Sequence, residues 1–199
     1  DSLSSDYQFG VLFRNSGFSS NPFQLVEKMS ERFLSDGGDF IHESVQNIKP
    51  SEQENITLRL ENREIQSERV LVAAGAWSHQ LASQLGVKIP LETERGYHVT
   101  LNSKEGGPQN IVMEAGHKFM ATPMEMGVRF AGTAEFAGLK TPANQTRAEI
   151  LLKLGKKMYP QLEDGETSDW MGHRPSIPDS RPVIDFCPNN KKIIFALSL

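Results

Sequence analysis

The segment from Gly172 to Ile184 carries the residues with the clearest chemical potential. It reads Gly-His-Arg-Pro-Ser-Ile-Pro-Asp-Ser-Arg-Pro-Val-Ile, with three prolines and one glycine in thirteen residues. Proline fixes the backbone φ angle, so this composition predicts a stiff loop between two strands. Arg174 directly precedes Pro175, which favours an extended backbone, and its planar guanidinium can bind a carboxylate through two parallel hydrogen bonds. An ordinary surface or intramolecular salt bridge is the other role open to this arginine.

A second candidate is the run of small residues from Val72 to Ser78, Val-Ala-Ala-Gly-Ala-Trp-Ser. Such a turn between an apolar strand and a helix lets a ligand backbone or a phosphate approach closely. Close packing of the strand on the helix, without any ligand, explains the small residues equally well. The sequence contains no Gly-x-Gly-x-x-Gly and no phosphate-loop pattern, so it holds no complete cradle for a dinucleotide pyrophosphate.

The remaining reactive residue types form no recognisable constellation. The five histidines lack metal-ligand spacing, and no Gly-x-Ser-x-Gly motif supports a hydrolase. Cys187 is the single cysteine, which excludes an internal disulfide and indicates a buried, inert thiol in a reducing compartment. Tyr97 begins an alternating segment after Gly96, where it could either pack in a core or direct its hydroxyl into a cleft.

Composition narrows the class of protein. The 199 residues include 21 Lys and Arg against 25 Asp and Glu, a net charge of −4, which argues against nucleic-acid binding by bulk charge. No apolar run approaches the roughly 18 residues of a membrane span. The chain begins at Asp1 without an initiator Met and ends in the apolar run 193–199, which predicts a piece of a longer protein. The alternative is a complete small domain whose last strand ends the chain.

The first half of the chain reads as mixed helix and strand. Asn21 can cap a helix that begins at Pro22 and ends before Gly37. The run Val70–Ala74 predicts a strand buried on both faces. The composition also predicts short strands at 40–43, 45–49 and 56–60, with a hairpin turn at 61–64. The spacing after Gly75 predicts a helix at 77–85.

The second half favours antiparallel sheet. Apolar and polar residues alternate along three segments separated by glycine-containing turns: 97–101, 118–122 and 128–132. The spacing predicts a helix over 144–159, with Ile150, Leu151 and Leu154 facing inward. Three further strands are expected near the end of the chain: 169–172, 182–186 and 192–197. The fold class is therefore α+β or α/β.

The Val72–Ser78 and Gly172–Ile184 motifs together resemble the FAD-dependent D-amino-acid oxidase and dehydrogenase family, whose relatives include glycine and sarcosine oxidases. The likeness is greatest to the D-amino-acid dehydrogenase branch and spans nearly the whole chain. It implies part of an FAD-binding nucleotide fold packed with a mostly antiparallel substrate-domain sheet. Residues 21–90 and 173–199 would form the partial FAD-binding domain, and residues 1–20 and 91–172 the discontinuous substrate-binding domain.

The resemblance also implies roles for individual residues. Arg174 matches the arginine that binds the substrate α-carboxylate, and Tyr97 is a candidate for lining the amino-acid pocket. Asp185 stands where the family commonly has glycine, which puts a flavin contact there in doubt. No catalytic base and no metal ligand are implied. The positions implied to contact FAD, mainly its adenosine and pyrophosphate part, are Val45, Ala73, Ala74, Gly75 and Trp77.

The activity implied is oxidative deamination of a D-amino acid, with hydride transfer from Cα to the flavin and release of a 2-oxo acid and ammonia. The expected partners are a small amino acid and an electron acceptor, either oxygen or a quinone, in the cytoplasm or at the inner-membrane periphery. The isolated 199-residue chain is expected to lack stoichiometric FAD. Two alternatives stay open: a non-redox α+β module that binds a carboxylate through Arg174, and an amine oxidase of the glycine or sarcosine type.

Overall fold

The structure is a computed structural model that describes residues 3–50 and 55–197. The chain divides into two compact units. Unit 1 comprises residues 1–39, 96–135 and 142–172, and unit 2 comprises residues 40–95, 136–141 and 173–199. The boundary between them crosses strands β5 (Glu92–Leu101) and β9 (Thr167–Ser176).

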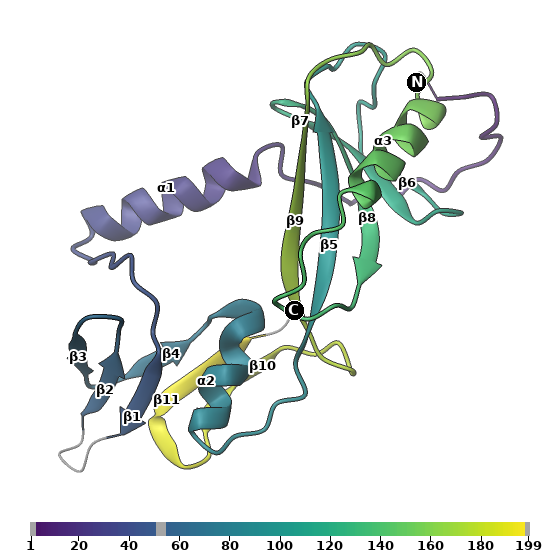
Figure 1. The fold of residues 1–199 in the computed structure, drawn as a ribbon. Helices are drawn as coiled ribbons and strands as arrows, with labels where there is room; N and C mark the ends of the chain where they lie inside the picture. The colour runs from purple at the N-terminus through teal and green to yellow at the C-terminus, as the bar shows by residue number, and fades with distance from the viewer. Residues whose placement is uncertain (1–2, 51–54, 198–199) are drawn as a thin grey trace. The chain divides into compact units, whose positions relative to one another are not determined.

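Unit 1 is built on an antiparallel sheet covered by one helix (Figure 1). The sheet has the strand order β6-β7-β8-β5-β9, where β6 is Val112–Glu114, β7 is Phe119–Met124 and β8 is Gly127–Glu135. Helix α3 (Thr146–Met158) packs on β8, and Leu151 joins Tyr97 and Phe130 in the buried core. The approach is close at Gly155, where a Cβ atom would lie 2.5 Å from the Phe130 ring.

Helix α1 (Pro22–Ser35) has the predicted boundaries and also falls within unit 1. The Asn21 side chain accepts a hydrogen bond from the Gln24 amide, and Gly37 follows the helix at φ +93°. Nothing in the described part of the chain buries its apolar face. The large apolar residues exposed on it are Phe23, Leu25, Val26, Met29, Phe33 and Leu34.

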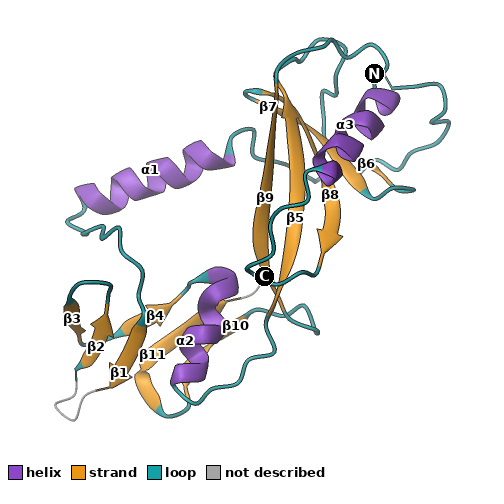
Figure 2. Ribbon diagram, in the orientation of Figure 1, coloured by secondary structure: helices purple, strands orange, loops and turns teal. Residues whose placement is uncertain are grey.

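Unit 2 contains two three-stranded sheets (Figure 2). One is an antiparallel meander of β1 (Asn47–Pro50), β2 (Ile56–Arg59) and β3 (Glu64–Ser67). The other has the order β10-β11-β4, in which β11 pairs antiparallel with β10 and parallel with β4. The bounds of these strands are Val183–Cys187 for β10, Asn190–Leu197 for β11 and Val70–Val72 for β4.

Two short helical segments follow β4, the 3₁₀ turn η1 (Gly75–Trp77) and helix α2 (Ser78–Gln84). Ala82 of α2 lies in one core cluster with Val72 and Phe195, so α2 covers one face of the β10-β11-β4 sheet. Leu71, whose side chain points to the opposite face, is 60% exposed.

The mixed α+β class is confirmed, but three expectations about elements are wrong. Residues 40–43 form no strand. The strand predicted at Val70–Ala74 is shorter and has one face exposed, because the described chain covers only the face that carries Val72. Ile150 is 48% exposed, since the inward stripe of α3 passes through Ala148, Leu151 and Gly155.

Residues 40–95 and 173–199 cluster in unit 2, whereas α1 clusters with unit 1, and the predicted domain of residues 21–90 and 173–199 stays a prediction. Helix α1 is connected to the rest of unit 1 by hydrogen bonds at its start. The Asn21 side-chain amide donates to the Glu125 carboxylate, and the Glu125 backbone amide donates to the Ser20 carbonyl. The assignment of cofactor and substrate roles to the two domains stays a prediction. Among the described residues, no helix combines the length and apolar character that crossing a membrane requires.

Candidate functional site

Arg174 lies within strand β9 rather than in the predicted loop. Its Nη1 donates a hydrogen bond to Oε1 of Glu94, on the neighbouring strand β5, at 2.9 Å. The side chains of Arg174 and Glu94 are 55% and 28% exposed, so solvent reaches both charges. Pro175 is tolerated there because β9 is the edge strand of its sheet, where a missing backbone N–H need not break a ladder.

A shallow hollow of about 310 Å³ brings the two sequence motifs together within unit 2. The small-residue turn contributes Ala73 and Gly75, and the proline-rich segment contributes Pro175, Pro182 and Ile184. Ala196 and Leu197 of β11 complete the lining. We call this feature the apolar hollow.

The backbone at Gly75 explains why a glycine stands in that turn. Its φ angle is +53°, a left-handed conformation that strains residues with a side chain, and a Cβ built there would meet no atom within 4 Å. None of the seven lining residues carries an ionisable side chain, so the apolar hollow suits a flat apolar ring better than a phosphate. A pyrophosphate held here would depend on main-chain N–H groups.

Trp77, a predicted cofactor contact, is held by a residue that the sequence analysis did not single out. The His173 ring meets the indole edge-on, with centroids 5.3 Å apart. His173 Nδ1 in turn lies 2.8 Å from Oγ1 of the buried Thr93. The indole remains 48% exposed. The position of His173, directly before Arg174 in the motif, was the signal that could have identified it.

The other predicted cofactor residues lie at the edges of this arrangement. Ala74 caps η1, and its carbonyl accepts the Trp77 amide at 3.1 Å. Val45 is half-buried against the core of unit 2 and does not line the apolar hollow. Asp185, whose side chain accepts the Phe186 amide, also lies outside the lining.

Tyr97 is buried in the core of unit 1, where it is 3% exposed. Its hydroxyl donates to Glu135 Oε2 at 2.5 Å and accepts the Asn144 amide at 3.1 Å. The Arg147 guanidinium lies 5.6 Å from the ring centre and pairs with Glu135 at 3.5 Å. Of the two roles left open by the sequence, this geometry favours packing; a role in lining the substrate pocket stays a prediction.

Arg95 is a charged residue whose burial the sequence analysis missed. It is 0% exposed, and its Nη1 donates to the Thr141 carbonyl at 3.0 Å within unit 2. Its place in the alternation of β5, between the buried Thr93 and the buried Tyr97, was the available signal.

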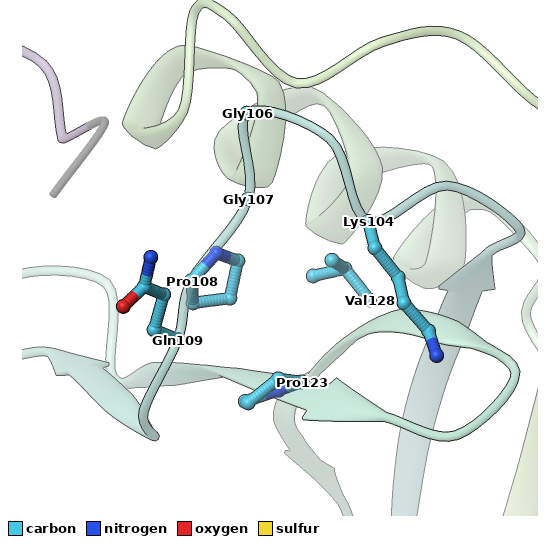
Figure 3. Close-up of a pocket in the computed structure, with 7 residues that line it drawn as sticks. All are labelled: Lys104, Gly106, Gly107, Pro108, Gln109, Pro123 and Val128. Carbon is cyan, nitrogen blue, oxygen red and sulfur yellow. The ribbon is translucent and has the colours of Figure 1, made fainter.

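Unit 1 has two further features that no motif indicated. His98 stacks on Trp170 with centroids 5.1 Å apart, and burial, reinforced by the nearby charge of Arg129, lowers the pKa of His98 to about 4. A hollow of about 400 Å³ lies at the turn after β5, with Pro108, Pro123 and Val128 facing one another (Figure 3). Neither feature contains a predicted site residue.

Comparison with known proteins adds an independent line of evidence. A family model described as FAD dependent oxidoreductase matches residues 1–199. The chain is 35% identical over 194 residues to a D-amino-acid oxidase of Bradyrhizobium diazoefficiens, covering 96% of this chain and 46% of that protein. It is 26% identical over 183 residues to a D-amino acid dehydrogenase of Vibrio vulnificus, covering 90% and 44%. The chain thus spans about half the length of the curated relatives it matches.

Solved structures share the fold. Glycine oxidase from Geobacillus kaustophilus aligns with a TM-score of 0.77 at 19% identity, over 87% of this chain and 47% of that one. L-proline dehydrogenase from P. horikoshii aligns with a TM-score of 0.73 at 19% identity, over 89% and 50%. At this identity the similarity concerns the fold alone.

Proposed function

Because the chain belongs to the family of FAD-dependent oxidoreductases, we propose that Arg174 and the apolar hollow serve the oxidation of a D-amino acid. The substrate would lose one proton from its α-ammonium and a hydride from Cα to bound FAD, and water would hydrolyse the resulting iminium to a 2-oxo acid and ammonium. The names of the related D-amino-acid oxidase and dehydrogenase support this substrate class. Family membership also decides against the non-redox carboxylate-binding module.

The observation that carries the proposal is the accessible guanidinium of Arg174 near the end of β9 in unit 2. Arg174 presents a half-exposed guanidinium, and the very next residue lines the apolar hollow shared with Ala73 and Gly75. Neighbouring side chains of a strand point to opposite faces, so Arg174 projects from the face of β9 that carries its pair with Glu94, and Pro175 lines the apolar hollow from the other face. A bidentate hold fixes orientation as well as position, and orientation alone can lower a reaction barrier by several kcal/mol, on the order of the effective-molarity effect.

The residues of the apolar hollow fit one wall of a flavin site. Gly75 offers open space where a side chain would intrude, and the remaining lining is apolar. Ala73, Gly75, Pro175 and Ile184 are the residues that would contact the cofactor. Bound FAD supplies the two-electron acceptor for the reaction.

The test uses the full-length protein and the substitution Arg174→Lys, which keeps the charge but loses the two-pronged donor geometry. We expect the KM for D-amino acids to rise by about 10- to 100-fold, the range for losing a hydrogen bond to a charged group. The matched control is Arg181→Lys, an exposed arginine in the same motif. An unchanged KM, or an equal effect from the control, would remove Arg174 from the substrate site.

A further inference from the structure

We propose that Glu94 binds the α-amino group of the substrate, so that Glu94 and Arg174 together recognise both charges of an amino acid. The inference rests on the proposed function and deepens it, because it assigns a second substrate-binding residue. Neither the motifs nor the comparisons draw attention to Glu94, which lies 80 positions from Arg174 in sequence.

The ion pair between Arg174 and Glu94 leaves donor and acceptor atoms that could bind the two charged groups of an amino acid. Within the described part of the chain, Glu94 contacts Arg174 through a single donor, Nη1, and a single acceptor, Oε1. A guanidinium has five N–H donors, so Nε and Nη2 stay available to a substrate carboxylate. A carboxylate accepts through both oxygens, so Oε2 of Glu94 stays available to an ammonium.

The spacing of these atoms suits one small molecule. The carboxylate and the ammonium of an amino acid are attached to the same Cα, and the groups that would bind them are 2.9 Å apart at their nearest atoms. Both side chains come from neighbouring strands and are open to solvent, so a ligand can reach them without displacing core residues. The assembled site would alternate positive and negative groups.

Electrostatics then predicts selectivity for amino acids over plain carboxylates. A ligand such as propionate can pair with Arg174, but its charge lies close to the like charge of Glu94, which raises the free energy of the complex. D-Alanine differs from propionate by its ammonium group, which Glu94 would bind. Glu94 would therefore favour the first ligand and disfavour the second.

A purely structural role makes a different prediction. If Glu94 only holds Arg174 in position, removing its charge would disorder the guanidinium and weaken both ligands alike. The ratio of the two affinities therefore separates substrate contact from positioning. It does so even in a variant with altered overall activity.

The experiment compares wild-type full-length flavoprotein with Glu94→Gln, which keeps the shape of the side chain but loses its charge. The two ligands are D-alanine, measured by its KM and by anaerobic spectral titration, and propionate, measured by its inhibition constant. We expect D-alanine to weaken by about tenfold or more, and propionate to bind equally or more tightly. Glu94→Asp should retain part of the preference for D-alanine. The matched control is Glu92→Gln, an exposed carboxylate on the same strand.

Two results would overturn the assignment: an equal loss for both ligands in Glu94→Gln, or no change for either. Failure of the proposed function would look different, because the wild-type flavoprotein itself would then show no reduction by D-alanine and no spectral response to it.

Discussion

Strand β5 carries two polar side chains, Tyr97 and Glu94, that differ in how they are bonded and exposed. In unit 1, Tyr97 is 3% exposed, and its hydroxyl forms hydrogen bonds with Glu135 and Asn144. In unit 2, Glu94 meets Arg174 through one hydrogen bond, and both side chains remain open to solvent. A polar group whose bonding capacity is met inside a core stabilises the fold, whereas a half-used, exposed pair is free to bind a ligand. Tyr97 and Glu94 thus differ in how far their hydrogen-bonding capacity is used and in their access to solvent.

The largest expected difference is in the free energy of unfolding, between an apolar residue in the core of unit 1 and one that lines the apolar hollow of unit 2. Leu151, on the buried face of α3, is 1% exposed, and replacing it with alanine should lower the free energy of unfolding by about 2–5 kcal/mol. Ile184 lines the apolar hollow at 73% exposure, so Ile184→Ala should change it by less than about 0.5 kcal/mol. Urea unfolding of the two variants measures the difference. Similar losses would mean that the hollow is as tightly packed as the core.

A smaller contrast concerns the two polar networks. Tyr97→Phe removes a buried hydroxyl and leaves Glu135 and the Asn144 amide without it, which should cost about 1–3 kcal/mol of stability. The same change should leave the KM for D-amino acids unaltered in the full-length enzyme. Arg174→Lys should do the reverse, with a stability change below about 1 kcal/mol because its ion pair is exposed. A raised KM in Tyr97→Phe would return Tyr97 to the substrate pocket.

The sequence predicted local features well where one residue type dictates the geometry. Asn21, Pro22 and Gly37 mark the ends of α1, and each acts as its chemistry requires. The apolar run at Val70–Ala74 misled, because continuous apolar residues suit a strand covered on both faces and equally one with an exposed apolar face. Prolines around Arg174 predicted a loop, but an edge strand accommodates Pro175.

The candidate site could be predicted only in part, for reasons of distance along the chain. The motif itself indicated Arg174, since an arginine before proline has a restricted backbone. Its pairing with Glu94 depends on the register between β5 and β9, and 80 residues separate the two side chains in sequence. The contact of His173 with Trp77 likewise arises from tertiary packing. Single residues were therefore visible in the sequence, while the pairs that they form required the structure.

The smallest expected effect tests how closed unit 1 is around His98. Burial lowers the pKa of this ring to about 4, beneath its ordinary value of 6.5, so the unfolded chain binds a proton more readily between these pH values. Stability from this group is therefore complete above pH 6.5 and declines as the pH falls toward 4, by about 1–2 kcal/mol once solvent screening of the half-buried ring is allowed for.

His98→Phe keeps the stack on Trp170 but cannot titrate, so it should lose less stability between pH 7.5 and pH 4.5 in urea unfolding. Asp169 opposes the shift, and Asp169→Asn serves as a control that should steepen the decline. If the stability of His98→Phe and of the wild type declined equally with falling pH, the His98 ring would be open to water. The contrast between the buried polar groups of unit 1 and the exposed Arg174–Glu94 pair would then weaken.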